Sequence, residues 1–139
     1  MKTIHLNFDG YWLEAGAHNV PVGSGVYCVY ACTYNVATDC VAIRDLLYVG
    51  ESCDVRGRLV NHERLSGWKR QLRSGEVLCY SVAKVAPSDR LNAEAALIHR
   101  HKPPCNTEYI TRFPFGVTMM HTSGMNALLE AVFAVRTKW

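Results

Sequence analysis

The chain has 139 residues, of which 49% are hydrophobic and 19% charged, and its formal net charge is +3. These values are typical of one folded domain and exclude a disordered or fibrous chain. No apolar run approaches the roughly 18 residues that span a bilayer, and the N-terminus lacks the apolar core of a signal peptide. We therefore expect a soluble, cytoplasmic protein that forms a single domain over residues 1–139 and has no membrane partner.

The first half of the chain predicts strands. "TIHLNF" (3–8) alternates like a short strand, and "NVPVGSG" (19–25) is typical of a loop. "GVYCVYACTY" (25–34) is rich in β-branched and aromatic residues, and "LLYVG" (46–50) is apolar on both faces, so both predict strands. We expect the connection between them, within residues 33–45, to be a loop.

The second half predicts helices around one further strand. A helix over about 55–65, capped by Asp54, is followed by a strand over 76–86. The clearest helix covers 87–104, where Ser88 or Asp89 is the cap and paired prolines end it. "FGVTMMHT" (115–122) could add a strand, and an amphipathic helix is expected from Met125 to Arg136. This order favours an α+β fold with a small sheet.

The six cysteines predict free thiols. They lie at positions 28, 32, 40, 53, 79 and 105, and none forms a C-x-x-C pair. Several fall in strand-like apolar runs, where cysteine behaves as a small hydrophobe. Without a secretory signal, disulfides and zinc are both disfavoured.

Two predicted helices point ionisable side chains at the sheet. Arg58 and His62 lie one turn apart within the apolar arc of the 55–65 helix, and Glu94 lies within that of the next helix. Tyr27 and Tyr48 come from the neighbouring strands. One interpretation is a structural Arg58–Glu94 salt bridge beside core tyrosines. The other is phosphodiester chemistry, since arginine binds phosphate, glutamate binds divalent cations, and tyrosine and histidine move protons.

These residues also match a known pattern. "GVY" (25–27) and "YVG" (48–50) lie on strands, Arg58 follows Tyr48 by ten residues, and His62 follows four later. Glu94 lies on a later helix, and Asn106 follows that helix. Over residues 24–108 the chain resembles the GIY-YIG nuclease superfamily, which leaves 109–139 as a C-terminal addition of a strand and a helix.

The resemblance implies a three-stranded antiparallel sheet flanked by helices, and hydrolysis of DNA with one Mg²⁺ or Mn²⁺ ion on Glu94. It implies that Tyr27 is the general base, that His62 takes or relays the proton, and that Arg58 stabilises the phosphate charge. Tyr48 would orient water or phosphate, and Asn106 would brace the site. The alternative is a catalytically silent nucleic-acid-binding module, or a partner-dependent subunit, on the same scaffold.

Several features around this pattern stay open. Glu51 stands where the family often has lysine, and it could cap the helix, pair with Arg56 or Arg58, or bind a second cation. Trp68 could stack on a nucleobase or pack on its own domain. The last helix could be core or the contact of a homodimer, and single- and double-stranded DNA are not distinguished. The candidate DNA-binding residues are Arg56, Trp68, Lys69, Arg70 and Arg73.

Overall fold

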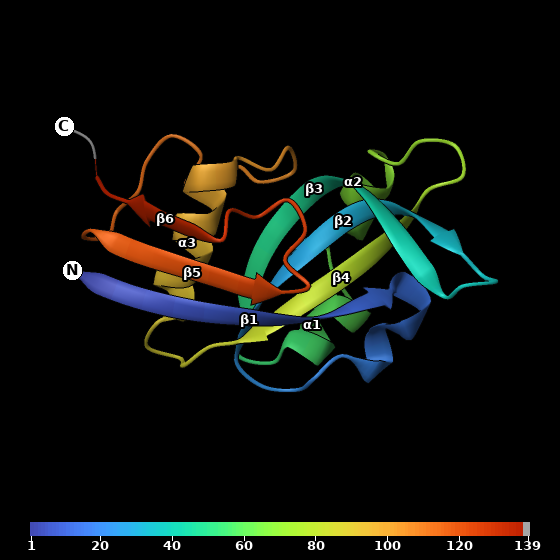
Figure 1. The fold of residues 1–139 in the computed structure, drawn as a ribbon, viewed down its shortest axis with the longest axis horizontal. Coiled ribbons are helices and arrows are strands. Elements are labelled where there is room, and N and C mark those ends of the chain that lie inside the picture. Colours follow the sequence, from blue (N-terminus) through green and yellow to red (C-terminus); the bar gives the residue numbers. More distant parts are fainter. Residues whose placement is uncertain (138–139) are drawn as a thin grey trace.

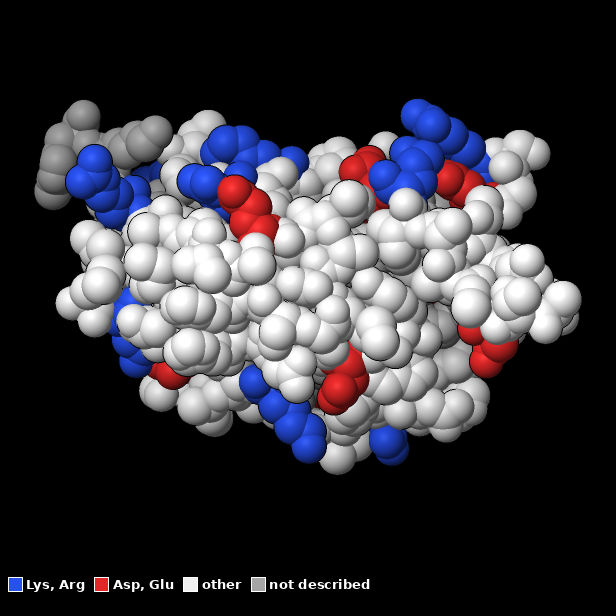
Figure 2. Space-filling model, viewed as in Figure 1, with Lys and Arg blue, Asp and Glu red and all other residues white. Residues whose placement is uncertain are grey.

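The protein is built on one six-stranded sheet, seen in a computed structural model that describes residues 1–137. The strand order is β3-β2-β4-β1-β5-β6, so β3 and β6 are the edge strands (Figure 1). Charged side chains lie mainly around the rim of the face in view, and its middle is uncharged (Figure 2). The elements in chain order are β1 (Lys2–Leu13), the short 3₁₀ helix η1 (Glu14–Asn19), β2 (Gly25–Asn35), β3 (Cys40–Ser52), α1 (Val55–Val60), α2 (Leu65–Lys69), β4 (Val77–Lys84), α3 (Arg90–His101), β5 (Thr118–Gly124) and β6 (Val132–Val135).

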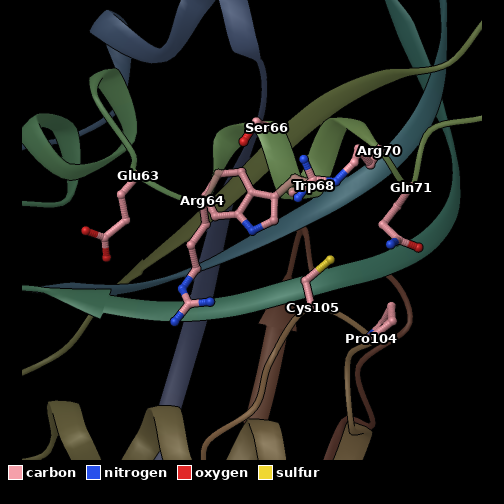
Figure 3. A pocket seen from close by; sticks show the side chains of 9 residues that line it. Glu63, Arg64, Ser66, Trp68, Arg70, Gln71, Pro104 and Cys105 are labelled. Atoms are coloured by element: carbon pink, nitrogen blue, oxygen red, sulfur yellow. The ribbon is translucent and has the colours of Figure 1, made fainter.

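Each face of the sheet has its own hydrophobic core. Helix α3 covers one face, where Leu97 and Ile98 pack with side chains such as Phe8 of β1. The short helices η1, α1 and α2 cover the other face, and Figure 3 shows Trp68 reaching from α2 towards the strands. Strand β2 is buried on both sides, as expected for a strand inside the sheet.

The α+β class is confirmed, but the predicted sheet of three strands is too small. The three predicted strands are neighbours, and β2 pairs antiparallel with both β3 and β4. The N-terminal strand continues the same sheet, because β1 pairs antiparallel with β4 and parallel with β5. Alternation in β1 explains this, since Ile4, Leu6 and Phe8 all point into the α3 core.

The predicted loop at residues 33–45 is wrong. Strand β2 runs to Asn35 and β3 begins at Cys40, so residues 36–39 alone make the turn of a long hairpin. The Asn35 side chain accepts hydrogen bonds from the backbone amides of Ala37 and Thr38, and Tyr34 donates one to Asp39. These local bonds form a tight turn where composition predicted a flexible connection.

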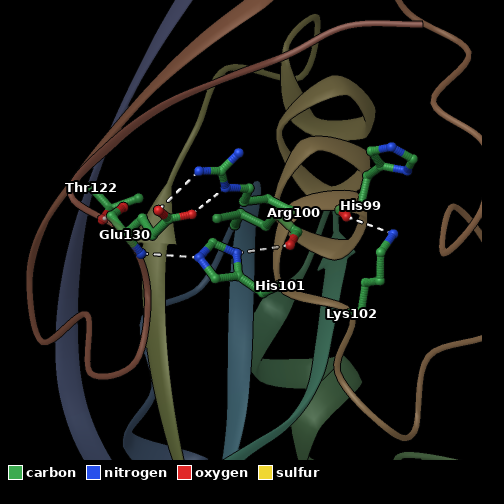
Figure 4. Close-up of polar contacts among 7 residues, drawn as sticks. His99, Arg100, His101, Lys102, Thr122 and Glu130 are labelled. Carbon is green, nitrogen blue, oxygen red and sulfur yellow. Dashed lines mark hydrogen bonds and ion pairs between the residues drawn. The ribbon is translucent and has the colours of Figure 1, made fainter. Parts of the chain in front are cut away.

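The predicted helix from Met125 to Arg136 is also wrong. Residues 125–131 form turns, and β6 pairs antiparallel with β5. Tertiary contacts override helix propensity here, because Glu130 is bound from several sides. Its carboxylate pairs with Arg100, its backbone amide donates to Nε2 of His101, and its carbonyl accepts from Thr122 (Figure 4).

The described residues include no helix that is long and apolar enough to cross a membrane.

All six cysteines have free thiols, as predicted.

We expect Phe133→Ala to lower the free energy of unfolding by about 3–5 kcal/mol, because it empties a core position. Phe133 is 4% exposed and packs with the α3 core, whereas the adjacent Val132 is 58% exposed. Val132→Ala is the matched control and should cost well under about 1 kcal/mol. Urea unfolding measures both, and equal losses would contradict the assignment of β6 to the core.

Candidate active site

Tyr27 is the buried centre of the candidate site. It lies on β2 opposite Gly50 of β3, and its side chain is 1% exposed. A Cβ atom on Gly50 would lie 2.3 Å from both Cζ and Oη of Tyr27. The tyrosine ring therefore occupies the space that a side chain at position 50 would need, and only glycine admits it.

His62 reaches Tyr27 because the helix predicted over 55–65 is interrupted. Asp54 caps α1 by accepting from the amide of Gly57, but α1 ends at Val60 and α2 begins at Leu65. In the turn between them His62 is 5% exposed, and its Nε2 lies 2.8 Å from Oη of Tyr27. The break in the helix, rather than the helical spacing, directs His62 inwards.

A backbone contact fixes the protonation of His62. The amide of Arg64 donates to Nδ1 of His62 over 3.1 Å, so Nδ1 has no proton. The neutral ring must then have its proton on Nε2 and donate it to Oη of Tyr27. Burial, with Arg58 adding to it, lowers the pKa of His62 to about 4. In this arrangement His62 is a donor to Tyr27, which differs from the expected role of taking its proton.

Trp68 packs within its own domain, the second of the two alternatives for this residue. Its side chain is 0% exposed, and its ring centroid lies 4.3 Å from that of His62 and 5.2 Å from that of Tyr48. No face of the indole is free for a nucleobase. Sequence patterns gave no sign that Trp68 supports His62, because the contact depends on the turn at residues 61–64.

Arg58 lies beside Tyr27 but does not pair with Glu94. Its guanidinium binds Glu63 over 3.0 Å, and this side chain is one-third exposed. Burial raises the pKa of Tyr27 well above its ordinary value of 10, Tyr48 and Glu94 add to the rise, and Arg58 opposes it. The salt bridge expected in the structural interpretation is absent from the ion pairs within residues 1–137.

Glu94 is a half-buried carboxyl group with an unusual pKa. Burial raises this pKa from 4.5 to about 8, and the charges of Glu51 and Glu108 add to the rise. The charge of Glu94 in turn raises the pKa of Tyr48, together with burial, which is the larger cause. Glu94 therefore shares one electrostatic environment with the two tyrosines.

Glu51 is engaged by a cation that the sequence did not suggest. It pairs with Arg90 at the start of α3, and not with Arg56 or Arg58. Arg90 also donates to the hydroxyl of Ser24, so the pair joins β3, α3 and the loop before β2. The helix cap expected as another role for Glu51 is supplied by Asp54.

Asn106 holds the turn after α3 against the edge strand. Its Oδ1 accepts from the amide of Val49, and its Nδ2 donates to the carbonyl of Val49, both over 2.9 Å. The amide of Cys105 adds a bond to the carbonyl of Leu47. The turn thus pairs with β3 as a short extra strand would, which fixes α3 and Glu94 beside Tyr48.

The candidate DNA-binding residues divide into engaged and free side chains. Arg56 donates to the carbonyl of Val20 over 2.6 Å, and Lys69 pairs with Glu14 over 3.0 Å. Arg70 and Arg73 are exposed, and within residues 1–137 neither forms an ion pair.

Glu94 is the one candidate site residue with a carboxylate that could hold a divalent cation, and among residues 1–137 no group of three or more histidine, cysteine, aspartate or glutamate side chains is placed to hold a metal. Mg²⁺ is commonly bound by one or two carboxylates plus water and substrate phosphates. Within residues 1–137 Glu94 forms no ion pair, so no side-chain cation neutralises its carboxylate. Glu94 is therefore the protein ligand that this environment offers.

Comparison with known proteins gives one match. Over 90 residues the chain is 32% identical to UvrABC system protein C of Zymomonas mobilis, and the match covers 63% of this chain. It covers 12% of the length of that protein. No family model and no solved structure matches the chain.

We expect Gly50→Ala to lower the free energy of unfolding by about 2–3 kcal/mol, because the new methyl group would displace the Tyr27 ring. Gly67→Ala is the matched control. Its Cβ would meet only Nη2 of Arg70, at 3.7 Å, so it should be neutral or slightly stabilising. Urea unfolding compares the two variants, and a tolerated Gly50→Ala would contradict the packing of Tyr27 on β3.

Glu94 should make the metal-free protein less stable as the pH rises. Between pH 4.5 and 8 the unfolded chain ionises this carboxyl while the folded protein retains its proton, so stability falls across that window. Glu94→Gln removes the effect and should be more stable than the wild type by about 2–4 kcal/mol at pH 8, with no difference near pH 4.5.

Urea unfolding at both pH values, with EDTA present, measures this difference. Asp9→Asn, at an exposed carboxylate that forms no ion pair within residues 1–137, is the control and should keep the wild-type pH dependence. Parallel profiles for the wild type and Glu94→Gln would show that Glu94 is not a buried acid.

Proposed function

We propose that this protein is a metal-dependent DNA endonuclease. The observation that supports it most directly is the buried Tyr27–His62 pair, which lies with Arg58 and the Glu94 carboxyl in one electrostatic environment. Structural cores rarely gather two tyrosines, an arginine, a histidine and an unpaired acid. Phosphodiester hydrolysis uses each of these groups.

Tyr27 is the proposed general base. Its oxygen accepts a hydrogen bond from Nε2–H of His62, a bond that favours the phenolate, and the charge of Arg58 favours it too. The base is the phenolate of Tyr27, formed once its own proton has left to solvent. As a water oxygen bonds to phosphorus, a proton of that water passes to the phenolate oxygen. The bond between phosphorus and the 3′ oxygen breaks, and the 3′ oxygen takes a proton from solvent. Arg58 stabilises the negative charge that grows on the phosphate.

Glu94 would hold the divalent cation, which supplies Lewis-acid stabilisation of the phosphate and of the leaving oxygen when bound. Ionisation of Glu94 requires a nearby positive charge at neutral pH, since its pKa without metal is about 8. Tyr48 is half-buried between Trp68 and Tyr27, in a position to orient water or phosphate.

The similarity to UvrABC system protein C supports a nuclease-related role in DNA processing. It concerns a small part of that protein, so its complete activity and its partners are not transferred to this chain. DNA is the proposed partner of this protein.

We expect Glu94→Gln to lose at least about 100-fold in the rate of nicking, because the substitution removes the proposed metal ligand. The measurement uses supercoiled plasmid and a labelled single strand with Mg²⁺, Mn²⁺ or EDTA. Asp9→Asn is the control at an exposed carboxylate and should cut at the wild-type rate. Undiminished cutting by Glu94→Gln would contradict the metal site. A wild type that binds DNA without nicking it would favour the silent binding module.

The hydrogen bond that His62 donates can be tested separately from the loss of its side chain. If His62 acts as a hydrogen-bond donor to Tyr27, the amide of Gln can replace it in part. We therefore expect His62→Gln to nick at least about 10-fold faster than His62→Leu. Equal inactivity of two folded variants, checked by circular dichroism, would instead show that His62 must accept a proton.

A further inference from the structure

A polar pocket lies beside the candidate active site. It has a volume of about 390 Å³ and is formed by α2, the turn before it and the turn that follows α3 (Figure 3). Arg64, Arg70 and Gln71 line it from the two ends of α2, and Cys105 lines it from the turn after α3. This volume is within the range of small-ligand sites.

The pocket and the active site share a wall. Trp68 lines the pocket and also packs on His62, at 4.3 Å between ring centroids. Arg64 lines the pocket, and its guanidinium carbon lies 5.9 Å from the centroid of the Tyr48 ring. A strand bound at Tyr27 and Tyr48 would therefore pass Arg64 to enter this pocket.

The charges of the lining favour an anion. Within residues 1–137, Arg64 and Arg70 form no ion pair, and the lining carboxylate of Glu63 is already paired with Arg58. Nε1 of Trp68 is a buried donor without a hydrogen-bond partner. In Figure 3 this nitrogen is on the edge of the indole that faces the side chains of Arg64 and Cys105. Two free guanidinium groups and an unsatisfied N–H donor suit a phosphate.

We propose that this pocket binds the phosphate of one unpaired nucleotide of the substrate, next to the scissile phosphate; this rests on the proposed function. A concave pocket of this size admits one nucleotide but not a duplex, whose strand cannot leave its partner to enter it. The substrate class is therefore DNA with an unpaired nucleotide at the cut, and Arg64 and Arg70 are the proposed phosphate ligands.

The first test is DNA affinity, measured by fluorescence anisotropy with the full chain carrying Glu94→Gln, in Mg²⁺. Adding Arg70→Gln should weaken binding of a labelled single strand about 5- to 10-fold. Arg136→Gln, an exposed arginine that follows β6 at the opposite edge of the sheet, is the control for loss of one charge and should change affinity less than about 2-fold. Equal effects of the two substitutions would overturn the proposal.

The second test is protection of Cys105 from N-ethylmaleimide, followed by mass spectrometry of the cysteine peptides. A bound single strand should slow modification of Cys105 and leave the exposed Cys40 unchanged. Equal protection by a duplex would overturn the assignment to an unpaired nucleotide. DNA that binds without protecting Cys105 would overturn the pocket and leave the nuclease proposal intact, whereas absence of any DNA binding would overturn both.

Discussion

The hydrogen bond between Tyr27 and His62 is the contact on which the candidate site depends. It is buried, it joins a strand inside the sheet to an irregular turn, and each partner is held by backbone features. Gly50 leaves room for the Tyr27 ring, and the amide of Arg64 fixes the proton of His62. Because a buried polar group without a partner costs roughly 1–3 kcal/mol, neither residue can move without disturbing the other.

The edge strand β3 organises the rest of the site. It supplies Tyr48 and Gly50, and its backbone also binds Asn106 and Cys105 after α3. The ion pair between Glu51 and Arg90 ties the end of β3 to the beginning of α3. These contacts hold Glu94 near the tyrosines, on a helix that packs mainly against the opposite face of the sheet.

The sequence predicted the central strands and the longest helix because their signals are local. Alternating and β-branched residues marked β1, β2 and β4, and capping residues with paired prolines marked α3. The helix prediction for the C-terminal segment failed for the opposite reason. Residues 125–136 have good helix propensity, but contacts with α3 and β5 hold 125–131 in turns and 132–135 in a strand. The hairpin turn at residues 36–39 was missed because its hydrogen bonds depend on the geometry of Asn35 and Asp39.

The sequence suggested the members of the candidate site but not the contacts between them. Helical spacing and the family resemblance suggested Tyr27, Tyr48, Arg58, His62 and Glu94. One of the two interpretations paired Arg58 with Glu94, whereas the structure pairs Arg58 with Glu63. It gave Trp68 two readings, of which the structure shows the buried one. It also contained no sign of the Arg64 amide or the Arg90 guanidinium, because backbone donors and long-range ion pairs leave no periodic pattern in a sequence.

The protonation of the His62 ring tests the central contact most directly. Long-range ¹H–¹⁵N NMR spectra of the folded protein at neutral pH report which ring nitrogen has the proton. We expect a neutral ring with its proton on Nε2. The ring should stay neutral down to about pH 5, because the pKa of His62 is lowered to about 4. A proton on Nδ1, or a charged ring at neutral pH, would contradict the arrangement of Tyr27, His62 and Arg64 and the role given to His62 as a donor.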